Sequence, residues 1–156
     1  MPTARPRVVA FDVIETTFSL EALRPRLIGL GLPPPALELW FARTLRDAFA
    51  LAATGVYAGF TDIARDTLLT LAAEHGIKAD GPALQSVLDG FAELDPQPDA
   101  ATAFRTLGAA GIGIVVLSNG AAETTRKLLD RASLAGLVRQ VVSVADIQSW
   151  KPLPAI

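Results

Sequence analysis

The stretch VVAFDVIET, residues 8–16, carries the strongest fold signal in the chain. It begins with four apolar residues rich in β-branched side chains, and Asp12 ends the run. Short continuous runs of this kind predict buried strands. Two more occur at residues 112–117 and 141–144. Because these runs are continuous and do not alternate with polar residues, they are typical of a parallel sheet covered on both faces.

Helical segments flank the second run. Residues 99–110 are predicted to form one helix, with Asp99 as its N-cap and Gly111 as its C-terminal stop. Residues 121–133 have helical composition and an apolar side. Strands that alternate with helices indicate an α/β fold with βαβ crossovers, so we expect a Rossmann-like parallel sheet core.

A long stretch, residues 18–96, separates the first strand from this unit and far exceeds an ordinary crossover. Three segments in it have helical patterns: residues 35–53, 62–75 and 82–93. We see no strong strand between them. We therefore expect residues 1–17 and 97–156 to form the α/β core, with residues 18–96 inserted after the first strand as a helical cap.

Composition narrows the possible partners. The 156 residues carry a formal net charge of −2, which gives no sign of the basic surface that nucleic acids or anionic membranes require. No cysteine is present, so disulfides and thiol catalysis are ruled out. No signal peptide is visible and the apolar runs are too short to span a membrane, so a cytoplasmic protein is the default expectation.

Polar side chains follow the predicted strands at their carboxyl ends. Asp12 follows the first strand, Ser118 and Asn119 follow the second, and Lys151 comes shortly after the third. In open α/β sheets these ends meet at one edge, where ligands bind. We therefore predict that these four side chains lie close together.

A carboxylate beside an ammonium group suits nucleophilic catalysis. Partial burial would favour the protonated form of Asp12, and Lys151 would oppose this and keep the carboxylate ionised. Thr16 can donate a hydroxyl hydrogen bond that orients a carboxylate oxygen. Ser118 and Asn119 add short polar donors that face the same space.

Each residue also has an ordinary structural interpretation. An aspartate after a strand is commonly a turn residue, Asn119 could cap the following helix, and Lys151 could be a surface lysine. Gly120 would let backbone N–H groups approach an anion, but Ser-Asn-Gly is also a common strand-to-helix turn. The joint pattern favours the functional interpretation.

Three segments resemble the motifs of the haloacid dehalogenase (HAD) superfamily, in the same order. They are residues 8–16, residues 115–120 (VVLSNG) and residues 150–152 (WKP). The resemblance covers the whole chain and implies a HAD-like core with an inserted helical cap. Residues 40–60 also look like the 2-haloacid dehalogenase (type II) branch.

This resemblance implies a hydrolase that displaces halide from a short 2-haloalkanoic acid through an ester intermediate. Asp12 would be the nucleophile and Lys151 would keep it ionised. Ser118 would bind the carboxylate of a small anionic substrate. Arg43, which matches the position of a cap arginine in that branch, would hold the departing halide together with Asn119. Dehalogenases of this branch look metal-free, so no cofactor is expected.

Two other functions stay open. The superfamily's phosphatases use Mg²⁺ and carry an aspartate, as proton donor, two residues after the nucleophile. Ile14 occupies that position here and cannot transfer a proton, which argues for displacement at carbon. A non-catalytic binding or assembly module with the same fold is the third possibility. A receiver-type signalling domain is set aside, because Asp12 follows the first strand and no acidic pair is present.

The family pattern continues after Lys151 with a fourth, acidic motif and with a strand beside the first one, and the sequence contains neither. We therefore expect the first strand to be an exposed apolar edge that pairs with another chain, giving a homodimer or a strand-exchanged oligomer. We also expect impaired ester hydrolysis, as in a truncated piece of a longer enzyme.

Overall fold

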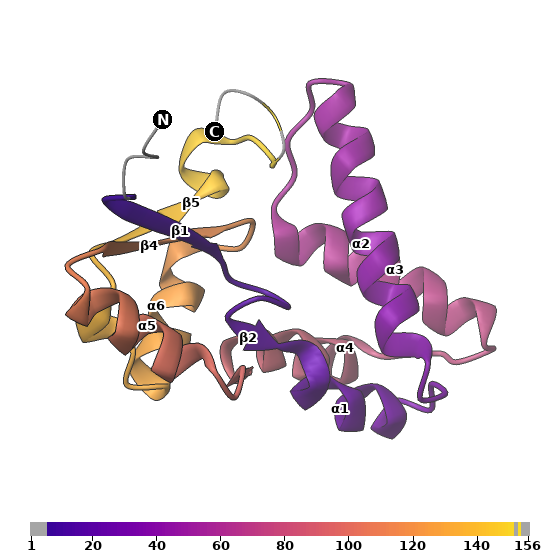
Figure 1. Cartoon of the computed structure of the whole chain (residues 1–156). Helices are drawn as coiled ribbons and strands as arrows, with labels where there is room; N and C mark the ends of the chain where they lie inside the picture. Colours follow the sequence, from indigo (N-terminus) through magenta and orange to yellow (C-terminus); the bar gives the residue numbers. More distant parts are fainter. Residues whose placement is uncertain (1–5, 152, 154–156) are drawn as a thin grey trace.

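Three parallel strands form the central sheet of the computed structural model, which describes residues 6–151 and residue 153. They are β1 (Val8–Asp12), β4 (Gly113–Ser118) and β5 (Gln140–Ser143), in the order β1-β4-β5 (Figure 1). Asp12 pairs in register with Leu117, and Ser118 with Ser143. The predicted parallel α/β sheet is confirmed.

Two helices lie on one side of this sheet (Figure 1). α5 (Ala100–Ala109) precedes β4, and α6 (Ala122–Arg131) connects β4 with β5 through a short 3₁₀ turn. The ring of Phe11 packs on that of Phe104, with ring centroids 4.9 Å apart. Asp99 stands at the N-cap of α5 without a capping hydrogen bond from its side chain. Gly111, at φ +74°, ends the segment as predicted.

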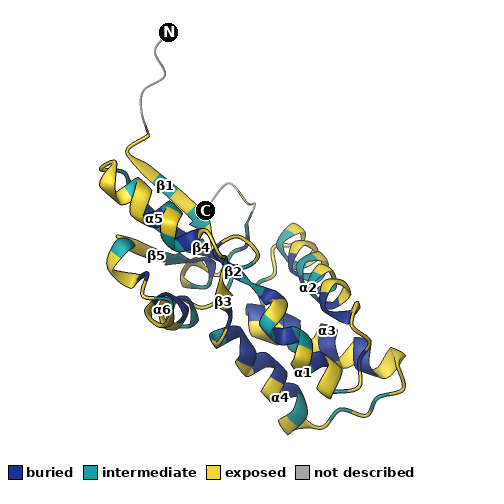
Figure 2. Ribbon diagram, turned by 60° about the horizontal axis from the view of Figure 1, so that its bottom comes forward, coloured by how far each residue is buried: buried dark blue, intermediate teal, exposed yellow. Residues whose placement is uncertain are grey.

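The opposite face of the sheet is partly open, so the expectation of cover on both faces is wrong. Val8 is 49% exposed, and Ala10 is also exposed (Figure 2). An apolar hollow on this face is lined by Ala10, Val115, Leu117 and Val142, among others. The apolar runs could not reveal this, because half-covered and fully covered strands can have the same composition. In the described sheet β1 pairs only with β4, so β1 is an edge strand, as expected.

The stretch between the strand β2 (Phe18–Ser19) and the strand β3 (Asp95–Pro96) is mainly helical. It contains α1 (Arg24–Gly29), α2 (Ala36–Ala53), α3 (Phe60–Glu74) and α4 (Gly81–Asp89), with 3₁₀ turns at Leu20–Leu23 and Gly90–Ala92. Figure 2 shows that α3 and α4 turn buried faces toward their neighbours. Within the described residues, no helix combines the length and apolarity that crossing a membrane requires.

Helices α2 and α3 pack through a mixed apolar and polar contact. The buried Trp40 indole donates a hydrogen bond to the Ala64 carbonyl at 2.8 Å, and the Thr44 and Thr67 hydroxyls lie 2.9 Å apart. Phe49, also on α2, is exposed. It lies near the C-terminal end of α2, beyond the pairs that join α2 to α3.

β2 and β3 were not predicted. They form a two-stranded antiparallel ladder at the points where the chain leaves the sheet and returns to it. The Gln97 amide also donates to the Thr17 carbonyl at 2.8 Å. Residues 95–97 therefore tie the two crossings together. Two-residue strands are too short to produce a periodic pattern.

We predict that Phe104→Ala lowers the free energy of unfolding by about 3–5 kcal/mol, because it empties a buried aromatic site beneath β1. Chemical denaturation would measure the change. Phe49→Ala is the matched control, since that ring is exposed, and it should stay within about 0.5 kcal/mol of the parent chain. Equal losses in the two variants would contradict this placement of the core.

Candidate active site

The ammonium group of Lys151 binds the carboxylate of Asp12. Lys151 Nζ lies 2.6 Å from Asp12 Oδ1 and also donates to the Leu117 carbonyl at 3.0 Å. The Asp12 side chain is 50% exposed and that of Lys151 22%. Asp12 Oδ1 also accepts the Val13 amide at 2.7 Å. One carboxylate oxygen is therefore held by two donors. The pair of Lys151 with Asp12 is also more exposed to water than the sequence suggested.

The turn after β1 orients Asp12 through its backbone. Thr17 Oγ1 donates to the Asp12 carbonyl at 2.6 Å, whereas Thr16, the predicted donor, lies exposed. Glu15 adopts a left-handed conformation with φ 61°, and its carboxylate accepts the Leu20 amide at 2.6 Å. The structure therefore gives Thr17, which sequence reasoning missed, the hydroxyl contact with Asp12. That contact is with the backbone carbonyl.

Ser118 and Gly120 form a closed turn at the end of β4. The Gly120 amide donates to Ser118 Oγ at 2.9 Å, so it is already used within the chain. This differs from the expectation that backbone N–H groups at Gly120 reach a ligand. The buried Ser118 hydroxyl accepts this bond and still has its own proton to donate.

Ser143 supports this turn from the neighbouring strand. Its hydroxyl donates to the Gly120 carbonyl at 2.8 Å and accepts the Ala145 amide at 3.1 Å, where the 3₁₀ turn Val144–Ile147 begins. Sequence reasoning missed Ser143. The signal was present, because Ser143 ends its strand in register with Ser118.

Asn119 contacts the segment that carries Lys151. Its Oδ1 accepts the Lys151 amide at 3.4 Å, a long hydrogen bond. The structure thus brings Asp12, Ser118, Asn119 and Lys151 to the same end of the sheet. Pro152, expected in the third motif, lies outside the described residues.

Arg43, on α2, is held by an ion pair with α3. Its Nη1 lies 2.8 Å from Glu74 Oε2, at the end of α3. Arg43 does not line the cavity described next. Its predicted contact with a ligand would require this ion pair to open.

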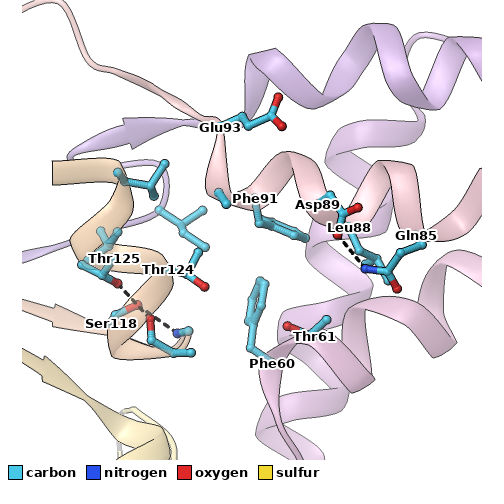
Figure 3. Close-up of a pocket in the computed structure, with 16 residues that line it drawn as sticks. Phe60, Thr61, Gln85, Leu88, Asp89, Phe91, Glu93, Ser118, Thr124 and Thr125 are labelled. Atoms are coloured by element: carbon cyan, nitrogen blue, oxygen red, sulfur yellow. Dashed lines mark hydrogen bonds between the residues drawn. The ribbon is translucent and has the colours of Figure 1, made fainter. Parts of the chain in front are cut away.

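A cavity of about 490 Å³ lies between helices α3 and α4 on one side and the turn after β4 with α6 on the other (Figure 3). Phe60, Leu88 and Phe91 line it from the cap. Ile14 and Ser118 line it from the sheet side. Neither Asp12 nor Lys151 is part of its lining, so the carboxylate lies outside this cavity. Among the described residues, no cluster of three or more His, Cys, Asp or Glu side chains could hold a metal ion.

Known proteins resemble this chain in sequence. An (S)-2-haloacid dehalogenase of Pseudomonas sp. (strain CBS-3) is 30% identical over 119 residues, which are 76% of this chain and 52% of that protein. One from Pseudomonas putida is 28% identical over 146 residues, 92% of this chain and 64% of that protein. The chain thus spans about half to just under two thirds of these relatives. No model of a protein family matches it.

The solved structures that this chain resembles are proteins of the same kind as these relatives. The L-2-haloacid dehalogenase of Xanthobacter autotrophicus has a TM-score of 0.86 at 26% identity, covering 96% of this chain and 61% of that one. Its form with covalently bound chloropropionic acid gives 0.85 at 25%, with the same coverage. The chain therefore has the fold of the HAD superfamily. Its homologues and structural neighbours are L-2-haloacid dehalogenases, the branch that the sequence motifs predicted.

We predict that Ser143→Ala destabilises the chain by about 1–3 kcal/mol, because the partly buried Gly120 carbonyl loses its donor. Thermal or chemical unfolding would measure it. Ser86→Ala changes an exposed serine on α4 and should stay within about 0.5 kcal/mol of the parent. If Ser143→Ala were as mild as this control, the turn at Gly120 would not depend on Ser143.

Proposed function

We propose that this chain carries the nucleophile site of a hydrolase that releases halide from short 2-haloalkanoic acids. The observation that carries the proposal is the contact of 2.6 Å between Lys151 Nζ and Asp12 Oδ1, which links two segments of the predicted motifs. The resemblance to (S)-2-haloacid dehalogenases supports the choice of substrate. The related enzyme with chloropropionic acid covalently bound supports an ester intermediate.

The chemistry begins at the free oxygen of Asp12. Oδ1 is held by Lys151 and by the Val13 amide, which leaves Oδ2 to attack C2 of the substrate. The new C–O bond forms as the carbon–halogen bond breaks, and the halide leaves with the bonding electrons. Water then attacks the ester carbonyl of Asp12. The bond between the carbonyl carbon and the substrate oxygen breaks; that oxygen takes one proton from the water and the second proton goes to solvent. This step restores the carboxylate and yields a 2-hydroxy acid with inversion at C2. No metal or organic cofactor is needed for either step.

The remaining residues receive supporting roles. Lys151 holds one oxygen of the Asp12 carboxylate in place, and the Ser118 hydroxyl binds the substrate carboxylate. Asn119 holds the departing halide through its amide N–H group. Arg43 shares this role only if it leaves Glu74, and we propose that substrate drives that exchange. Thr16 and Gly120 act by shaping the two turns.

The two parts of the chain divide this work. We propose that residues 1–17 and 97–156 form the core that carries the nucleophile, and that residues 18–96 form the cap over it. The ladder of β2 with β3, where the chain passes between the two parts, supports this division.

We predict that the purified chain releases halide from (S)-2-chloropropionate, and that Asp12→Asn reduces release to background because the amide is a poor nucleophile. Halide assay and mass spectrometry of an ester on the Asp12 peptide would measure both steps. Asp66→Asn, at an exposed position on α3, is the matched control and should react like the parent.

The same assay separates the alternatives. Hydrolysis of p-nitrophenyl phosphate that EDTA abolishes, without halide release, would replace this proposal with a magnesium-dependent phosphatase. Ile14 argues against that result, because it offers no proton to a leaving oxygen. Absence of both reactions and of the ester would favour a non-catalytic module.

We further propose that two copies associate through the edge of β1. The strand has one neighbour in the described sheet, and Val8 is an exposed apolar residue on it. Unpaired, apolar edge strands are templates for pairing with another chain.

We therefore expect a dimer in size-exclusion chromatography with light scattering. Val8→Lys should shift it toward monomer, because a charged side chain on an edge strand opposes pairing. Val56→Lys places the same charge at an equally exposed valine in the α2–α3 loop and should leave the dimer intact. A monomeric parent chain would rule out this association.

A further inference from the structure

Trp150 stands at the junction between the cap and the lysine of the site. The indole is only 1% exposed, although it comes from the short segment after β5. Its ring centroid lies 6.3 Å from that of Tyr57 and 6.4 Å from that of Phe60. Tyr57 lies in the α2–α3 loop and Phe60 begins α3. Two residues of the helical insert thus hold the residue directly before Lys151.

Burial and two nearby carboxylates show that Tyr57 lies where the helical insert meets the segment before Lys151. Burial raises the pKa of the Tyr57 hydroxyl, and the carboxylates of Asp62 and Asp146 raise it further. Asp62 belongs to α3, and Asp146 belongs to the 3₁₀ turn that leads to Trp150. Tyr57 therefore lies between the cap and the segment that carries Lys151.

Lys151 needs such an anchor. Its side chain is long and flexible, yet Nζ sits on two acceptors, Asp12 Oδ1 and the Leu117 carbonyl. The hydrogen bond of the Lys151 amide, to Asn119, is 3.4 Å long and therefore weak. Trp150, the residue directly before Lys151, is by contrast almost completely buried.

Packing of the Trp150 ring, and not a hydrogen bond of its indole N–H group, keeps the ring in place. Nε1 is buried, and within the described residues it has no hydrogen-bond partner. An unpaired buried donor opposes folding, so apolar packing of the ring, including its contacts with Tyr57 and Phe60, holds it in place. Phenylalanine can keep part of this packing without the unpaired donor.

We propose that Trp150 is a positioning residue: Tyr57 and Phe60 hold its indole, and the indole holds Lys151 on Asp12. The position of the cap thereby controls whether the ammonium group reaches the nucleophile. The consequence for catalysis rests on the function proposed above, whereas the placement of Lys151 does not.

The test follows the ammonium group of Lys151 by nuclear magnetic resonance. Hydrogen bonds to Asp12 and Leu117 should slow exchange of its protons with water and make its ¹⁵N signal visible. We expect Trp150→Ala and Tyr57→Ala to abolish this signal, and Trp150→Phe to retain it. Val56→Ala, at an exposed position next to Tyr57, should leave it unchanged. Asp12→Asn assigns the signal, because it removes the charged acceptor.

The outcomes separate positioning from general damage. A protected Lys151 signal in folded Trp150→Ala or folded Tyr57→Ala would overturn the proposal. If Trp150→Ala does not fold, Tyr57→Ala decides alone, because it leaves the indole in the chain. Halide release should fall together with the signal. A parent chain that shows the protected signal but releases no halide would disprove the proposed function and leave the positioning role standing.

Discussion

The contact between Lys151 and Asp12 depends on the whole sheet, because the two residues are 139 positions apart. β4 makes it possible. Leu117 pairs with Asp12 on one side and with Val142 on the other, and its carbonyl accepts the Lys151 ammonium group. A shift of one residue in either pairing would turn a strand over and separate the two charges. The apolar packing that fixes this register, including Phe11 on Phe104, therefore serves the site as much as the stability of the fold.

Around this contact, each turn is held by the neighbouring strand or turn. Thr17 fixes the backbone of Asp12, Ser143 fixes Gly120, and Asn119 contacts the amide of Lys151. All three contacts involve short polar side chains at or next to strand ends. There, side chains can replace the backbone partners that strands lose. The carboxylate lies in a frame whose parts support one another, so damage to one turn should spread to the next. The aromatic contacts of Trp150 extend this frame into the cap.

Much of the fold could be predicted from the sequence, because buried strands and helices require apolar residues in runs or at regular spacings. The three apolar runs match β1, β4 and β5 to within about a residue, and Gly111 ends α5 where a left-handed conformation is needed. The hydrogen-bond and ion-pair partners of individual side chains produce no such pattern in the sequence. The choice of Thr17 over Thr16 follows from the left-handed conformation of Glu15, which no pattern announced. The pairing of Arg43 with Glu74 follows from how α2 crosses α3, which is set by buried contacts such as Trp40 with Ala64.

The open face of the sheet connects association with chemistry. Val8, Ala10 and Asp12 alternate with the more buried residues of β1, so Asp12 lies on the same face as the exposed apolar residues. An ion pair that is half exposed is weakened by water and by salt. Any chain that covers this face would remove water from around Asp12 and strengthen its attraction to Lys151. A partner that extends from the edge of β1 over this face would therefore change the surroundings of Asp12 as well as cover the exposed apolar residues.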